Sequence, residues 1–218
     1  MSDNTQDRLK TVSIAGLAPT QMTVGMHEVD FKRRRWREEN CRRAASYLGS
    51  HSIPLILGPD GRRYIIDHHH LVRALHDEGV IEVPASIVAD LSTLGFDKFW
   101  CTLETRRCTH PFDDEGRRRS YDDMPKTVFD LIDDPWRSLT GALKRAGGYV
   151  KDKALFSEFQ WADFLRRRIA RETIECDFDA ALVLAIELAR SREAMSLPGW
   201  LGAASTKEAA AGSSAASG

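Results

Sequence analysis

The segment "PLILGPDGRRYIIDHHHLVRALHDEG", residues 54–79, constrains the fold more than any other part of the sequence. Two apolar runs flank Pro59-Asp60-Gly61, and this order of residues favours a tight turn, so the segment predicts a β-hairpin. The residues that follow place apolar side chains at helical spacing and end at Gly79, which predicts a helix directly after the hairpin. A hairpin followed at once by a helix indicates a small mixed α/β unit.

Other segments extend this pattern on both sides. "TVSIAGL" (11–17) predicts a short strand, "MHEVDFKRRRWREENCRRAASYLG" (26–49) a helix, and "VIEVPASIVADL" (80–91) a strand in which Pro84 favours an edge position or a strand start. Beyond residue 91 the patterns are almost all helical. The expected helices cover 92–104, 124–132, 133–148, 156–169 and 178–195. In the last two, core packing is the default role of the aromatic side chains.

The fold class that follows is α+β, with a small mixed-sheet domain and then a mainly helical region. We expect a flexible N-terminus at 1–10, the α/β domain at 11–92, helices packed on it at 93–200 and a disordered tail at 201–218. The tail is "LGAASTKEAAAGSSAASG", which is rich in small and polar residues.

Charge and cysteine usage narrow the class of protein. The chain has 218 residues and a formal net charge of −1, so its charge does not point to DNA as a partner. Its basic clusters at 32–37, 116–120 and 166–171 are flanked by acids and read as solvated faces. The four cysteines are scattered without a CxxC pair, which disfavours a zinc site and a disulfide framework. Without a signal-peptide or membrane-spanning pattern, a cytoplasmic protein is expected.

The three consecutive histidines stand where the predicted strand becomes a helix. Asp67 precedes them as the expected N-cap, and the backbone N–H groups of residues 68–70 form an anion-binding corner. Helical spacing puts His68 on the apolar stripe, partly buried, and puts His69 and His70 on the outer side. Adjacent histidines point about 100° apart on a helix and chelate one ion poorly, so no metal site is predicted. A helix start with no function at all stays open as an alternative.

At this point the residues resemble a known group of proteins. Asp67, the histidines and Ala74 resemble the strand-to-helix joint of the ParB/sulfiredoxin fold, where free serine kinases carry DGHHR. In that pattern His69 and His70 match the two histidines, His68 replaces the glycine, and Leu71 replaces the arginine. The stretches "LAPTQMTVGMHEV", "DHHHLVRAL", "ADLS" and "DDPWRSLTGALKRAGGY" resemble bacterial ParB-like nucleases more closely, over roughly Thr11 to Trp200. Chromosome-partitioning ParB proteins and sulfiredoxins are more distant, and no cysteine lies at the joint.

The resemblance implies a phosphate site at Asp67–His70. Its implied catalytic residues are Glu28, Asp67, His69 and His70. Its implied nucleotide or phosphate ligands are Gln21, Lys32, His68, His69, His70 and Arg73, with Arg62 or Arg63 as further sources of charge. Two simpler roles stay open, because Glu28 and Lys32 are spaced for an i,i+4 surface ion pair and Gln21 has the position of a turn-closing residue.

The expected function is the binding of ATP, ADP, CTP or another nucleotide, with transfer of its phosphate to an unknown acceptor or its hydrolysis, and with Mg²⁺ left open. A DNA-binding protein or ParB-like nuclease is the alternative, and a non-catalytic nucleotide-sensing switch is the second. A homodimer stays open. We expect that His69→Ala with His70→Ala removes nucleotide-dependent activity and leaves thermal stability nearly unchanged.

Overall fold

The structure is a computed structural model that describes residues 10–49, 52–151 and 156–202, with the backbone alone for 40–49. Residues 1–9 of the expected flexible N-terminus, all but two residues of the expected tail and the side chain of Cys41 lie outside the described residues, whereas Lys10 begins a strand. The chain divides into two compact units, the first ending at Asp134 and the second beginning at Pro135. The boundary falls well beyond residue 92, and the helix Phe96–Thr105 with the loop after it lies in the first unit.

Among the described residues, all the strands lie in the first unit. They are β1 (Lys10–Ser13), β2 (Leu17–Pro19), β3 (Thr23–Val24), β4 (Ile53–Leu57), β5 (Arg63–Ile65), β6 (Glu82–Asp90) and β7 (Ile132–Asp133). Five strands form a mixed sheet in the order β1-β6-β4-β5-β2, and β3 pairs with β7 in parallel as a separate ribbon. The helices of this unit are α1 (Met26–Gly49), α2 (His69–Asp77) and α3 (Phe96–Thr105). The sequence-based fold class of α+β is confirmed.

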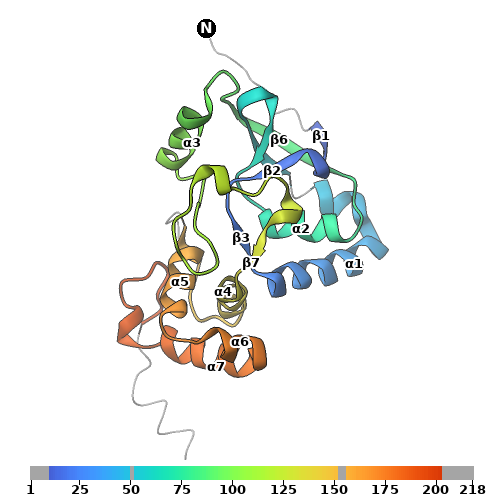
Figure 1. The fold of residues 1–218 in the computed structure, drawn as a ribbon. Helices are drawn as coiled ribbons and strands as arrows, with labels where there is room; N and C mark the ends of the chain where they lie inside the picture. Colours follow the sequence, from blue (N-terminus) through green and yellow to red (C-terminus); the bar gives the residue numbers. More distant parts are fainter. Residues whose placement is uncertain (1–9, 50–51, 152–155, 203–218) are drawn as a thin grey trace, which may run out of the picture. The chain divides into compact units, whose positions relative to one another are not determined.

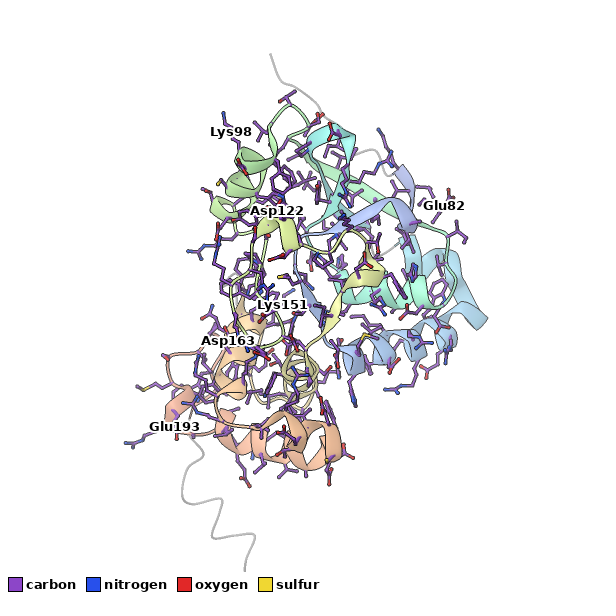
Figure 2. All side chains as sticks on the ribbon, in the orientation of Figure 1. Glu82, Lys98, Asp122, Lys151, Asp163 and Glu193 are labelled. Atoms are coloured by element: carbon purple, nitrogen blue, oxygen red, sulfur yellow. The ribbon has the colours of Figure 1, made fainter. Side chains whose placement is uncertain are left out.

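The sheet lies between two helical layers (Figure 1). Leu55 and Ile65 point to the layer made by α1 and α2, whereas Ile56 and Tyr64 point to α3, because side chains alternate along a strand. Lys98 on α3 and Glu82 at the start of β6 are exposed and project away from these layers (Figure 2). The two apolar surfaces explain why the short runs of β4 and β5 are apolar almost throughout.

The predicted hairpin is confirmed. β4 and β5 pair antiparallel around Pro59–Gly61, where Asp60 has φ 58° and Gly61 has φ 69°. Gly58 is needed for packing, since a Cβ there would lie 2.5 Å from the Tyr64 ring. The Tyr64 ring therefore packs against the turn of its own hairpin, and the chain after Ile65 continues into α2.

Two segments differ from the sequence-based expectation. The stretch 11–17 is not one strand, because a 3-10 turn at Ile14–Gly16 breaks it and sends β1 and β2 to opposite edges of the sheet. The predicted helix at 124–132 is wrong. Only Val128–Asp130 forms a short 3-10 turn, since Arg73 binds the carbonyl groups that a helix would use and β7 then pairs with β3. Pro84 lies near the start of β6, which is an inner strand.

The second unit is helical, as predicted. It consists of α4 (Pro135–Arg145), α5 (Ser157–Arg166), α6 (Arg171–Cys176) and α7 (Phe178–Ala189). Its core is built around Trp161, which is fully buried, stacks on Tyr149 at 4.6 Å and donates from Nε1 to the carbonyl of Pro198 at 2.8 Å. Within this unit Trp161 and Phe164 are core residues, as their default role predicted.

Candidate functional site

The turn between β5 and α2 differs in detail from the predicted cap. His68, not Asp67, is the N-cap residue, and it has a left-handed backbone with φ 64°. Asp67 instead accepts the N–H of its neighbour His68 at 2.6 Å. A left-handed conformation favours glycine and is tolerated by histidine better than by most residues. The same backbone shape is thus compatible with the glycine of the DGHHR pattern and with His68 in this chain.

His69 and His70 face the protein and hold the loop between β2 and α1. The Nε2 atom of His69 accepts the backbone N–H of Thr20 at 3.2 Å, and that of His70 accepts the N–H of Gly25 at 3.0 Å. His69 is only 5% exposed, so its predicted place on the outer side of the helix is wrong. The reason is tertiary, because the 20–25 loop covers the first turn of α2 and supplies backbone donors there.

These contacts bring the N-terminal ends of two helices together. His70, in the first turn of α2, bonds to Gly25 just before α1, whereas Glu78, just after α2, bonds to Arg33 and Arg37 further along α1. The two helices therefore run side by side in the same direction. Because a helix dipole is positive at its N-terminus, both positive ends lie at one corner.

The Glu78 link fixes this alignment. Its carboxylate accepts from Nε of Arg33 at 2.7 Å and from Nε and Nη2 of Arg37 at 2.7 and 2.6 Å. The hydrogen bonds from Arg37, followed by those from Arg33, hold the pKa of Glu78 below its ordinary value. A carboxyl whose pKa is lower in the folded than in the unfolded protein stabilises the fold at pH values above its ordinary pKa. This contribution is lost as the pH falls through the pKa of the folded state.

Glu78→Gln is therefore expected to lower the free energy of unfolding at neutral pH by about 1 kcal/mol. In the variant, the free energy of unfolding should also fall less steeply as the pH is lowered, because the contribution of Glu78 is already absent. Urea unfolding at a series of pH values between about 3 and 7 measures both effects. Glu82→Gln is the matched control, since Glu82 is an exposed carboxylate at the start of β6. Equal slopes of stability against pH for wild type and Glu78→Gln would contradict the assignment.

A carboxylate from a distant segment occupies the start of α1. Asp133 Oδ1 accepts the N–H of Met26 at 2.8 Å, and β7, which carries Asp133, is held beside β3 by strand pairing. This contact was not predictable from the sequence, because the acids before Pro135 are also typical of the start of the next helix. The corner thus contains His70, the first turn of α1 and one carboxylate that is about 107 positions away in sequence.

The predicted residues of α1 and its loop lie at or near this corner. Glu28 is in the first turn of α1, its side chain is 13% exposed, and Lys32 Nζ lies 3.6 Å from its Oε1. The i,i+4 pair considered in the sequence is therefore present. Gln21 is buried and donates from Nε2 to the carbonyl of Thr23 at 2.7 Å, so it does close a turn in the loop that His69 and His70 hold.

Arg73 points elsewhere. Its Nε bonds to Asp77 at 3.1 Å, and its Nη1 donates to the carbonyls of Phe129 at 2.9 Å and Leu131 at 3.3 Å. Its guanidinium carbon also lies 5.2 Å from the centre of the Phe129 ring. These contacts fasten the segment before β7 to α2. Of the hairpin arginines, Arg62 is exposed and binds the carbonyl of Lys126, and Arg63 is exposed.

One further histidine near the site was missed by the sequence analysis. His110 donates its backbone N–H to the carbonyl of Thr20 at 2.9 Å and pairs with Gln21 as an isolated bridge. Thr109 donates its hydroxyl to the same carbonyl at 2.8 Å. The stretch "CTHP" after α3 therefore lies against the loop that His69 holds. Its only signal in the sequence was a histidine before a proline, which is too common to single out a site.

Two broader features concern metals and membranes. Within the described ranges, no group of three or more His, Cys, Asp and Glu side chains is arranged to hold a metal ion. Among the residues the structure describes, no helix combines the length and apolar character that crossing a membrane requires. Cys101, Cys108 and Cys176 are free thiols.

Residues 10–167 match a protein family described as "Putative ParB-like nuclease". The chain belongs to this ParB-like nuclease family. The matched residues include the β5–α2 turn with His69 and His70, and the 20–25 loop to which these histidines bind. They also include α4 and α5 of the second unit. The resemblance stated from the sequence is therefore confirmed.

A solved structure supports the same assignment. The chain is 52% identical to protein Atu1540 from Agrobacterium tumefaciens, whose crystal structure superposes with a TM-score of 0.84. The similarity covers 90% of this chain and 99% of that one, so both units of the ParB-like protein have counterparts there. No curated protein matches the chain.

Proposed function

We propose that the chain binds a phosphate group of a nucleic acid at the corner where α1 and α2 begin, and cleaves the phosphodiester bound there. The observation that carries the proposal is the parallel arrangement of the two helices, fixed by His70 at one end and Glu78 at the other. The family description supports a phosphodiester as the substrate.

The electrostatics of the corner favour an anion. Two helix N-termini contribute partial positive charge and backbone N–H groups, the combination that binds phosphate in many folds. Asp133 already gives α1 an anionic partner at Met26. Asp67 likewise accepts the N–H of His68, so the substrate phosphate belongs beside His69 and His70 in the first turn of α2, with Lys32 as the nearest predicted source of charge on α1.

The histidines can take part in the neutral form. Since the Nε2 atoms of His69 and His70 accept hydrogen bonds, the ring proton of each neutral imidazole is on Nδ1. A donor of this kind, held in place before the reaction, stabilises the charge that develops on a phosphate oxygen. His70, which is less buried than His69, is the candidate donor, and His69 positions the loop.

Glu28 is the candidate base. It lies in the first turn of α1 and is mostly shielded from solvent. In hydrolysis, a water oxygen attacks phosphorus while the Glu28 carboxylate takes its proton, and the bond from phosphorus to the leaving oxygen breaks. A carboxylate can instead hold Mg²⁺ together with phosphate oxygens and water, so the cation is a variable in the test.

A second candidate is the binding of a mononucleotide such as ATP, ADP or CTP, with transfer or hydrolysis of its terminal phosphate or with sensing alone. It is favoured by one observation. Arg73, the next cation along α2, binds the carbonyls of the segment before β7. It therefore does not add a positive charge beside the corner that could bind a second phosphate of a nucleic acid strand. A site with donors for a single phosphate fits a terminal phosphate as well as a phosphodiester.

The test compares both substrates on the same protein. End-labelled single- and double-stranded DNA are incubated with the full chain, with and without Mg²⁺, and cleavage is followed on denaturing gels. ATP, ADP and CTP are tested in parallel by calorimetry and by phosphate release. We expect DNA cleavage by the wild type and a loss of about 10²-fold or more in Glu28→Gln, because a positioned base contributes that much.

Glu38→Gln is the matched control, since Glu38 is an exposed carboxylate on the same helix. It is expected to cleave as the wild type does. Hydrolysis of a nucleotide without DNA cleavage would replace the first function by the second. Failure to bind either class of ligand would reject both.

A further inference from the structure

The segment that leads into β7 exposes two large apolar side chains of the first unit. Phe129 is 61% exposed and Ile132 is 46% exposed, whereas Val128 and Leu131 of the same segment are buried. In Figure 1 this segment is the yellow stretch that lies along α2. Because single apolar side chains are common on protein surfaces, the surroundings of Phe129 decide what its exposure means.

The Phe129 ring is held with one face open. The guanidinium carbon of Arg73 lies over the ring at 5.2 Å from its centre, and the His76 ring lies beside it with the two centroids 5.7 Å apart. The exposed face is therefore the one turned away from α2. A capping box fixes the turn beneath the ring, since Asp130 accepts from the N–H and the hydroxyl of Thr127 at 3.0 and 2.8 Å. An aromatic face that is already fixed loses little freedom when a flat group stacks on it.

The ring lies close to the corner where α1 and α2 begin. Arg73, which binds the Phe129 carbonyl, follows His70 by three residues on α2, or about 4.5 Å along the helix axis. Asp133, at the start of α1, follows Phe129 by four residues, so the chain between them spans at most about 14 Å. A strand with one phosphate at the corner can therefore place the base of a neighbouring nucleotide on the ring.

Positive charge is found on the far side of the ring as well. Lys126 is exposed three residues before Phe129. Arg62 of the hairpin is also exposed and donates from Nη2 to the Lys126 carbonyl at 2.6 Å, so its guanidinium is held at the same place. An aromatic face with phosphate-binding groups on both sides is the arrangement with which proteins hold single strands of nucleic acid.

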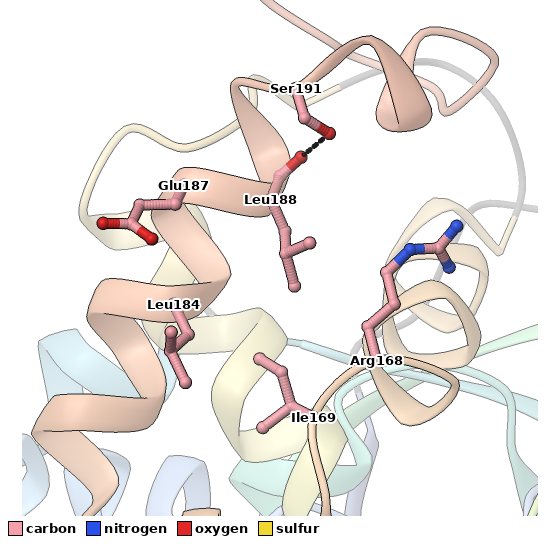
Figure 3. Close-up of a pocket in the computed structure, with 6 residues that line it drawn as sticks. All are labelled: Arg168, Ile169, Leu184, Glu187, Leu188 and Ser191. Atoms are coloured by element: carbon pink, nitrogen blue, oxygen red, sulfur yellow. Dashed lines mark hydrogen bonds between the residues drawn. The ribbon is translucent and has the colours of Figure 1, made fainter. Parts of the chain in front are cut away.

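The groove beside α7 in the second unit has a different character. Figure 3 shows Leu184 and Leu188 pointing toward Ile169, with the stem of Arg168 at one side. The groove has a volume of about 290 Å³. Arg168 is bound from Nε to Glu193 at 2.8 Å, so its charge is already partnered. This groove presents mainly aliphatic side chains and does not suit a phosphate-bearing strand.

We propose that a base of a single-stranded nucleic acid stacks on Phe129 while a neighbouring phosphate of the same strand binds beside His69 and His70. The inference rests on the proposed function and narrows its substrate. In a duplex the bases stack on one another, so only an unpaired base can offer its face to the ring. Arg62 and Lys126 then attract the next phosphate of the strand. Because every base has such a face, little preference for sequence is expected.

Fluorescence anisotropy of the full chain with two labelled DNA strands of about 12 nucleotides tests the proposal. One strand carries thymine at every position, and the other is abasic with the same phosphates. EDTA is present to prevent metal-dependent cleavage. We expect the wild type to bind the thymine strand at least about 5-fold more tightly, the smallest usual effect of one stacked base. Phe129→Ala should remove this preference and leave the affinity for the abasic strand unchanged.

Two further variants separate the aromatic face from simple bulk. Phe129→Tyr should keep the preference for the thymine strand, whereas Phe129→Leu should lose it, because only tyrosine retains a flat ring. Phe96→Ala is the matched control, since Phe96 on α3 is also an exposed aromatic residue, with 43% exposure. It should bind both strands as the wild type does. Thermal unfolding of each variant confirms that it is folded.

The outcomes distinguish this inference from the proposed function. Equal binding of the two strands by the wild type, or a preference that persists in Phe129→Ala, overturns the stacking site, leaves the phosphate site standing and makes the exposed ring a contact for a protein partner. Failure to bind either strand rejects the phosphate site and the stacking site together. A preference that depends on Phe129 in a protein that cleaves no DNA supports the stacking site and rejects only the cleavage.

Discussion

His70→Ala is expected to lower the phosphodiester cleavage or nucleotide turnover of this ParB-like protein by about 10²–10³-fold, the usual effect of removing one positioned donor from a reacting oxygen. The ring also accepts the N–H of Gly25, a partly buried contact, so the free energy of unfolding should fall by about 1 kcal/mol. Steady-state rates and urea unfolding of the same preparations measure the two effects separately.

His69→Ala is expected to act mainly on stability. His69 is buried, and without its ring the N–H of Thr20 has no acceptor, which costs about 1–3 kcal/mol. The double variant should therefore be clearly less stable than the wild type, contrary to the expectation drawn from the sequence. His76→Ala is the control, because His76 is on the same helix and its ring lies near Asp77 and Phe129 instead of the 20–25 loop. If His70→Ala keeps full activity, the histidines only hold the loop.

Arg73→Ala is expected to destabilise the protein by about 2–3 kcal/mol, because hydrogen bonds from a charged donor are worth more than neutral ones. Arg73 joins Asp77 of α2 to the carbonyls of Phe129 and Leu131. Its loss should also loosen β7 and with it the contact of Asp133 with the start of α1. Activity should then fall although Arg73 does not touch the proposed phosphate.

Hydrogen exchange separates this role from direct phosphate binding. In Arg73→Ala, amides of β3 and β7 should exchange faster, whereas the affinity for inorganic phosphate or a short oligonucleotide should change little once the protein is folded. Arg73→Lys should recover only part of the loss, since an ammonium group cannot reproduce the planar fork. Arg34→Ala, an exposed arginine on α1, serves as the control. A large loss of affinity for phosphate with unchanged hydrogen exchange of β3 and β7 would show that Arg73 binds the phosphate directly.

The local pattern of the chain determined most of the secondary structure. The turn at Pro59–Gly61, the helix ended by Gly79, the helix over residues 26–49 and the helix from Pro135 were all predictable, because turn residues and apolar periodicity act over a few positions. The histidine segment, together with the stretches around residues 17–29, 89–92 and 133–149, was also enough to identify the family. These features depend on interactions within one element or between adjacent ones.

The tertiary structure decided the rest, for reasons that act over long distances in sequence. His69 turned inward because a loop 49 positions earlier supplied a backbone donor, and the predicted helix at 124–132 was replaced because Arg73 and β3 took its carbonyl and N–H groups. Asp133 reached the start of α1 through the same pairing. Periodicity shows which side of a helix is apolar but not which backbone groups of a distant segment need partners. The sequence therefore pointed to the DHHH turn as the proposed site, and only the packed structure showed that His69 is buried against the 20–25 loop and that Arg73 binds the segment before β7.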